Sequence, residues 1–241
     1  MSGPPARIFL LSHMRAYTSL VGHLLGSHPE IDGYYEMHRS YRFADDLDRQ
    51  AAQYAAADAP KPGRRYLFDK LLHNDYALDL DALGPIPVAV LASLRQPAPT
   101  LRSIVHLFAE KHHDDPYATP VGAAGYYIAR LQALAAFGTR YQGRYFYFDA
   151  ERIRSDTAAT LRTLSAWLQL GSPLSPQYRR FSQTGVVGAG DSSPAIGAGR
   201  VLDAVNPYAD IALDAASLAE AERTYADCRA TLIAHAAASL N

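Results

Sequence analysis

Short apolar segments alternate with amphipathic segments along most of the sequence, and this alternation limits the possible folds more than any other feature. The apolar segments have the length of buried strands and cover residues 7–12, 65–69, 87–94 and 144–148. Helical spacing of apolar residues covers residues 18–27, 42–57, 121–141, 156–170 and 214–240, and another helix begins at Pro97. This alternation predicts an α/β fold with a central parallel sheet flanked by helices, in which ligands bind beyond the carboxyl ends of the strands.

The size and charge of the chain narrow its organisation and partners. Its 241 residues, 49% of them hydrophobic, fit a single domain over residues 1–241. The 23 basic and 24 acidic residues give a net charge of -1, which speaks against a nucleic-acid partner. Apolar runs are too short for a signal peptide or a membrane span, and the one cysteine, Cys228, excludes an internal disulfide. We expect a cytoplasmic protein, and the sequence indicates no oligomeric state.

The turn between the first strand and the first helix is suited to an anion. It reads SHMRAYTSL over residues 12–20. A helix N-terminus presents unpaired amides and a partial positive charge, while Arg15 adds a cation and Thr18 and Ser19 add hydroxyl donors. The turn lacks the glycines and the lysine of a nucleotide-triphosphate P-loop. The alternative is an ordinary helix start capped by Thr18 or Ser19.

A second candidate anion site follows the strand at 87–94. Arg95 comes at the end of this strand, and Ser103 lies eight residues later in the next helix. Both positions are expected at the carboxyl edge of the sheet, where an arginine binds phosphate with two hydrogen bonds and a serine adds a third. The alternative is a solvated arginine at a strand end.

Together these segments resemble the sulfotransferases that use 3′-phosphoadenosine 5′-phosphosulfate (PAPS). The run Arg15-Ala16-Tyr17-Thr18-Ser19-Leu20 is similar to the family's 5′-phosphosulfate loop, commonly Arg-Ser-Gly-Thr-Thr-Leu, and LLGSHPEI after it is also typical. Arg95, Pro97 and Ser103 match the family's 3′-phosphate element. The segment YFYFDAERIRSDTAATLRTLSAWLQL, residues 145–170, is similar to the family's strand ending in Tyr-Glu-Asp-Leu and the helix that follows. The resemblance covers about residues 7 to 170.

The resemblance implies a P-loop-like fold and sulfuryl transfer from PAPS to a hydroxyl, with 3′-phosphoadenosine 5′-phosphate (PAP) as product and no metal. PAPS has no γ-phosphate, which accounts for the missing P-loop lysine. The implied donor-binding residues are Arg15, Ala16, Tyr17, Thr18, Ser19, Arg95, Ser103, Tyr147 and Arg200. The chain departs from the family at Ala16 and Tyr17, where Ser and Gly are usual. Tyr17 is expected to be strained if that glycine has a positive φ; the alternative is a reshaped loop with the ring in the acceptor pocket.

Four residues are candidates for the chemistry. Glu36 follows His-Pro at a distance similar to that of the base in the protein-tyrosine branch of the family, with His38 as the second choice. Lys70, at the end of the strand at 65–69, resembles a catalytic cation that stabilises charge on the leaving oxygens, as does Arg15. Glu36 and Lys70 each have a plain alternative as a solvated side chain. For His73 a position on a helix surface is favoured over one in the lining of a polar pocket.

Two polar segments remain. The glycine-rich stretch at 183–200 is by composition a linker, whereas in the family such a segment closes over the donor, with Arg200 as its basic residue. The run His112-His113-Asp114-Asp115 has the residue types of a metal site, but we expect a surface loop there.

Two other classes of function stay open. One is a P-loop nucleotide kinase, which the absence of Gly-Lys-Ser/Thr disfavours; the other is a non-catalytic nucleotide-binding protein with a decayed site, which the Ala16-Tyr17 pair favours. Loops determine which acceptor such a fold uses, and the sequence does not identify it. The acceptor therefore stays open among small-molecule, carbohydrate, lipid and peptide hydroxyls.

Overall fold

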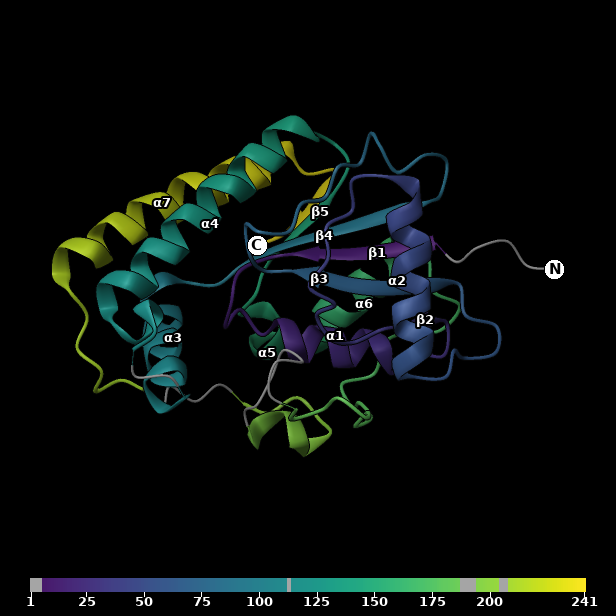
Figure 1. Ribbon diagram of the computed structural model, residues 1–241, viewed down its shortest axis with the longest axis horizontal. Helices are drawn as coiled ribbons and strands as arrows, with labels where there is room; N and C mark the ends of the chain where they lie inside the picture. The colour runs from purple at the N-terminus through teal and green to yellow at the C-terminus, as the bar shows by residue number, and fades with distance from the viewer. Residues whose placement is uncertain (1–5, 112–113, 187–193, 204–207) are drawn as a thin grey trace.

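The centre of the molecule is a six-stranded sheet. The computed structural model describes residues 6–111, 114–186, 194–203 and 208–241. The strands are β1 (Ala6–Leu11), β2 (Ile31–Asp32), β3 (Tyr66–Leu71), β4 (Val88–Leu94), β5 (Phe146–Asp149) and β6 (Ala238–Leu240). Their order is β2-β3-β1-β4-β5-β6, and all neighbours are parallel (Figure 1). The predicted α/β fold with a central parallel sheet is confirmed.

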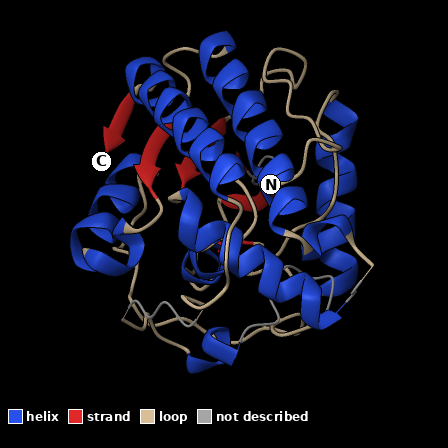
Figure 2. Cartoon of the chain, turned by 90° about the vertical axis from the view of Figure 1, so that its left-hand side faces the viewer, coloured by secondary structure: helices blue, strands red, loops and turns tan. Residues whose placement is uncertain are grey.

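Helices cover both faces of the sheet. One face carries α2 (Ala44–Ala57), α3 (Pro97–Lys111), α4 (Pro120–Arg140) and α7 (Ala215–His235), and the other carries α1 (Thr18–Gly26), α5 (Arg152–Ser155) and α6 (Thr157–Trp167). Two short 3-10 helices, η1 (Pro116–Ala118) and η2 (Pro194–Ala198), lie in connections. Figure 2 shows helices on two sides of the strands, and the strand that ends at C lies at the outer edge. Strand β1 is buried on both faces because its side chains alternate: Phe9 and Leu11 join one cluster, and Ile8 and Leu10 join the other.

The strand order brings three loops to one place. The chain leaves β1, builds β2 and β3 on one side of it, and then crosses to form β4 on the other side. Leu11 is paired with Leu71 of β3 and with Ala92 of β4, so the three strands end at nearly the same level. The loops after β1, β3 and β4 therefore meet at the point where the direction of chain progression reverses, the usual ligand position in such sheets.

The sequence missed two short strands. The helix expected over residues 214–240 ends at His235, since Ala236 is already extended, with φ -68° and ψ 150°. The next residues pair with β5 as β6, and the amide of Ala237 donates to Tyr145 O at 2.9 Å. The two-residue strand β2 falls between the segments that the sequence pattern assigns. The pattern predicted too long a helix because the last residues pair with the backbone groups at the open edge of the sheet.

Close packing of α1 fixes the segment that carries Glu36. A Cβ atom at Gly22 of α1 would lie 2.2 Å from Tyr34 O, so only glycine permits this approach. Gly33 has φ +83°, and a Cβ there would lie 2.3 Å from Phe68 O of β3. The segment after β2 therefore passes tightly between α1 and β3 and places Glu36 beside the ends of β1 and β3.

Along the described parts of the chain, we find no helix that has both the length and the apolar character required to traverse a bilayer. The cytoplasmic location expected from the sequence stays a prediction.

Candidate functional site

The loop after β1 has an unusual backbone. Arg15 and Tyr17 both have a positive φ, 63° and 56°, which side chains with a Cβ rarely adopt. Tyr17 is the N-cap residue of α1, and its side chain makes no capping hydrogen bond. The ordinary N-cap at Thr18 or Ser19 that the sequence left open is thus not formed; both residues are buried in the first turn of the helix. The start of α1 keeps its partial positive charge for an anion.

The ring of Tyr17 turns toward two arginines. The guanidinium carbon of Arg95 lies 4.4 Å from the ring centroid, and that of Arg154 in α5 lies 5.3 Å from it. Tyr17 therefore has a positive φ, the conformation in which strain was expected from the sequence, and its ring contacts two cations. Arg154 also donates to Leu202 O at 2.7 Å and to Asp203 O, which fixes the chain after η2 to the loop.

The two candidate anion sites form one network. Arg15 Nε donates to Ser103 Oγ in α3 at 2.8 Å, and Arg95 Nη1 donates to Arg15 O at 2.8 Å. Arg95 is only 9% exposed, and its Nε finds no hydrogen-bond acceptor among the described residues. The structure thus brings together Arg15, Arg95 and Ser103, which the sequence placed in two separate motifs.

Lys70 reaches the same place from β3. Its side chain is 1% exposed, and Nζ donates to Ser19 Oγ at the start of α1 at 3.0 Å. A buried ammonium at a helix N-terminus adds to the positive potential there. Lys70 is consequently not the solvated strand-end lysine of the plain alternative.

Glu36 lies near the ends of β1 and β3, because its charge acts on Asp69 of β3 and on Arg130, which binds the carbonyls after both strands. Glu36 is 5% exposed, and its Oε1 lacks a hydrogen-bond partner among the described residues; His38 Nδ1 is 3.8 Å away. His38 has φ 54°, and its side chain is 42% exposed. His73 is half-buried, and burial lowers its pKa, an effect that Glu36 opposes. Of the two candidate bases, Glu36 is thus the one withdrawn from solvent.

Asp69 of β3 holds the segment that carries Glu36 through two hydrogen bonds. Its Oδ1 accepts the amide of Met37 at 2.9 Å, and its Oδ2 accepts the hydroxyl of Tyr41 at 2.5 Å. Burial raises the pKa of Asp69 to about 7, although these hydrogen bonds and one from the Lys70 amide oppose the rise. The carboxyl of Asp69 therefore fixes the backbone next to Glu36.

Sequence reasoning missed Arg130, which ties the strand ends together. It lies on α4, is 5% exposed, and donates through Nε to Ser12 O at 2.8 Å and through Nη2 to Leu71 O at 2.5 Å. Its signal in the sequence was a charged residue on the apolar face of a helix, between Tyr127 and Leu134. A buried arginine in such a position requires several acceptors, and here the carbonyls after β1 and β3 supply them.

Two predicted donor-binding residues lie apart from this network. Tyr147 is fully buried on the α4 and α7 face of β5, and its hydroxyl donates to Asp149 at 2.7 Å, which Arg229 holds with two hydrogen bonds. Arg200 is exposed, and its backbone pairs with Gln177. No hydrogen bond between described residues links either of them to the loop at 12–17.

Parts of two predicted segments fall outside the described residues: 187–193 of the glycine-rich stretch, and His112 and His113. Asp115 accepts the amide of Tyr117 and so begins η1. Among the described residues, no group of three or more His, Cys, Asp or Glu side chains is arranged to hold a metal ion.

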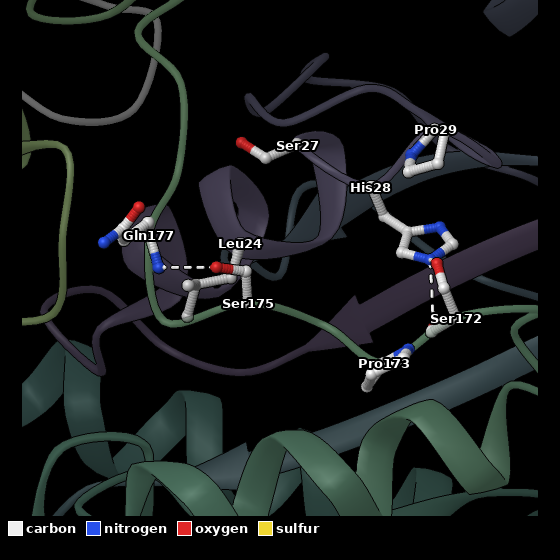
Figure 3. A pocket seen from close by; sticks show the side chains of 8 residues that line it. All are labelled: Leu24, Ser27, His28, Pro29, Ser172, Pro173, Ser175 and Gln177. Carbon is white, nitrogen blue, oxygen red and sulfur yellow. Dashed lines mark hydrogen bonds between the residues drawn. The ribbon is translucent and has the colours of Figure 1, made fainter.

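A small pocket lies at the other end of α1. Its lining residues are Leu24, Ser27, His28, Pro29, Ser172, Pro173, Ser175 and Gln177 (Figure 3). His28 Nε2 lies 2.9 Å from Ser172 Oγ, so this part of the predicted LLGSHPEI run joins the helix end to the chain after α6. A helix of nine residues is about 13 Å long, which separates the pocket from the cation cluster.

Two solved structures resemble this chain in fold. A sulfotransferase domain from the curacin biosynthetic pathway has a TM-score of 0.60 at 16% sequence identity, and the match covers 95% of this chain and 99% of that domain. A sulfotransferase domain from the Synechococcus PCC 7002 olefin synthase has a TM-score of 0.57 at 15% identity, covering 93% of this chain and 96% of that one. No protein-family model and no curated protein matches the sequence. The chain has the sulfotransferase fold, which confirms the fold expected from the sequence resemblance.

Proposed function

We propose that this protein is a sulfotransferase that transfers the sulfuryl group of PAPS to a hydroxyl acceptor. The observation that supports it best is the single network at the ends of β1, β3 and β4. Within it, Arg15, Lys70 and Arg95 gather at the start of α1, and the buried carboxylate of Glu36 belongs to the segment that Asp69 of β3 holds through the Met37 amide. Cations and a buried carboxylate at the same strand ends suit a reaction in which the cations stabilise a negatively charged leaving group and the carboxylate accepts a proton.

The residues present fit a donor with two separate anionic groups. The uncapped start of α1, with Arg15, Lys70 and Ser19, would bind the phosphosulfate. Arg95 and Ser103 would bind the 3′-phosphate, and the buried Arg95 Nε that has no acceptor among the described residues is a donor available for it. Among the described residues, Tyr147 and Arg200 form no hydrogen bond with this group, so we assign them no part in the reaction.

The proposed reaction is an in-line displacement at sulfur. The acceptor oxygen forms a bond to sulfur while the bond between sulfur and the phosphate oxygen breaks, which yields a sulfate ester and PAP. Glu36 takes the proton of the acceptor hydroxyl, and Lys70 and Arg15 stabilise the charge that develops on the leaving phosphate oxygen. Asp69 keeps Glu36 in place through the Met37 amide.

The acceptor would be a small-molecule hydroxyl. The similar domains come from a biosynthetic pathway and an olefin synthase, which favours small molecules over carbohydrates and peptide tyrosines. This assignment rests on likeness of fold, so an acceptor screen with PAPS has to establish it.

Calorimetric titration with PAP, ADP and ATP with magnesium tests the donor assignment. We expect selective binding of PAP, and Arg95→Ala should weaken it by about 2 to 5 kcal/mol because two charge-assisted hydrogen bonds are lost. Arg223→Ala, which removes an exposed arginine on α7, is the matched control and should bind PAP as the wild type does. Equal affinity for PAP and ADP, or a preference for ATP with magnesium, would contradict the proposal and favour the kinase or decayed-site alternatives.

A further inference from the structure

His13 lies between the two anion-binding elements. It is fully buried in the loop after β1, and its Nδ1 is 2.9 Å from the carbonyl oxygen of the next residue, Met14. Its Nε2 is 3.0 Å from the backbone nitrogen of Arg95, which follows β4. The ring therefore bridges two loops that are 82 residues apart in the sequence.

These contacts determine the state of the ring. A carbonyl oxygen only accepts a hydrogen bond and a backbone amide only donates one, so Nδ1 must carry the proton and Nε2 must be the acceptor. Burial lowers the pKa of His13 to about 3, and the nearby charges of Arg95 and Arg130 act in the same direction. The imidazole is thus neutral, in one tautomer, at neutral pH.

The backbone of Arg95 is held from both sides. His13 accepts its N–H, and the hydroxyl of Tyr127 in α4 donates to its carbonyl oxygen at 2.7 Å. The two rings also contact each other edge-on, with centroids 4.8 Å apart. The direction in which the Arg95 side chain leaves the loop is therefore set by these two aromatic residues.

We propose that His13 is a positioning residue that fixes the distance between Arg15 and Arg95, and hence between the two anionic groups that the protein binds. This inference rests on the proposed function, because it assumes that Arg95 binds the 3′-phosphate. His13 acts through the Arg95 backbone and does not touch the ligand. Its loss should therefore weaken recognition of the 3′-phosphate more than that of the 5′-phosphate.

The affinity ratio of PAP to adenosine 5′-phosphate measures this effect. The two ligands differ only in the 3′-phosphate. His13→Leu leaves the Arg95 amide without its acceptor, so we expect the ratio to fall about tenfold, as is usual when a binding group is displaced. His13→Gln restores an acceptor oxygen and should keep the ratio within about threefold of the wild type. In an Arg95→Ala background, His13→Leu should not change the ratio further.

The outcomes separate this proposal from the proposed function. If wild-type protein does not prefer PAP over adenosine 5′-phosphate, the donor assignment itself is wrong. If it does, but His13→Leu weakens both ligands equally, His13 is only structural and the proposal is overturned. Nitrogen NMR of the wild-type imidazole gives a test that needs no variant to fold: protonated Nδ1 with unprotonated Nε2 supports the proposal, and the opposite tautomer overturns it.

Discussion

Tyr17 allows a direct measurement of the strain in the loop after β1. Its backbone is left-handed, with φ 56° and ψ 19°, a conformation that costs a residue with a Cβ about 1 to 2 kcal/mol. Tyr17→Ala keeps this cost and removes the ring, whereas Tyr17→Gly removes both. Glycine also gives the unfolded chain about 0.5 to 1 kcal/mol more conformational freedom. Since both variants lose the contacts with Arg95 and Arg154, we expect Tyr17→Gly to be more stable than Tyr17→Ala by about 0.5 to 1 kcal/mol.

Urea unfolding of the two variants is the assay, with the slope of the transition checked for equality. A thermal melt should give a melting temperature about 2 °C higher for the glycine variant, given the size of the chain. Gln169 is a matched control, because it also has a positive φ, 51°, but is exposed after α6, away from the loop. Gln169→Gly should likewise be more stable than Gln169→Ala. An alanine variant at Tyr17 as stable as the glycine variant would refute the strain argument.

The remaining predictions concern the carboxylate, the lysine and the two buried titratable groups. Glu36→Gln should lower kcat about 10²- to 10⁴-fold with PAP affinity retained, since the base is lost and its shape is kept; unchanged turnover in a sulfate-ester assay would rule out Glu36 as the base. Lys70→Met, which keeps the length of the side chain, should lower kcat about 100-fold. A similar loss of PAP affinity with unchanged kcat would mean that Lys70 contributes to binding only. Because the pKa of His13 is lowered to about 3, the unfolded protein binds more protons than the native protein below about pH 6.5. Keeping His13 buried and neutral therefore costs about 2 kcal/mol of stability at pH 5. His13→Gln should lose less stability than wild type when the pH falls from 7 to 5. Asp69 gives the opposite pH dependence of stability, because its pKa is raised to about 7 and the native protein binds more protons than the unfolded protein between about pH 4 and 7. In urea unfolding, Asp69→Asn should lose less stability than wild type as the pH rises from 4 to 7.

Residues at the ends of strands were the most predictable part of the site. Arg95 and Lys70 follow apolar segments that read clearly as buried strands, and parallel strands in this fold end at one edge. Their arrival at the start of α1 followed from topology alone. A positive φ at Tyr17 was one of two alternatives, and it came from comparing the glycine usual in the resembling family with the residue present here.

Side-chain direction and long-range contacts were not predictable. The alternation along β5 puts Tyr147 on the opposite face from Phe146 and Phe148, but a strand pattern does not say which face meets which helix. His13 and Arg130 have partners 82 and 118 residues away, so no local pattern identifies their role. Strand β6 has only three residues, too few for a period of two to be recognised.

The hydrogen bond from Arg130 to Ser12 also bears on how the protein folds. The loop at 12–17 takes its native conformation only when β1 has paired with β3 and β4 and Arg130 of α4, 118 residues further along the chain, has reached Ser12. Contacts between such distant segments form slowly, because the entropy of closing long loops opposes them until most of the domain has assembled. We therefore expect binding competence to appear only with the final cooperative folding step, and amide exchange in this loop to report global opening of the domain.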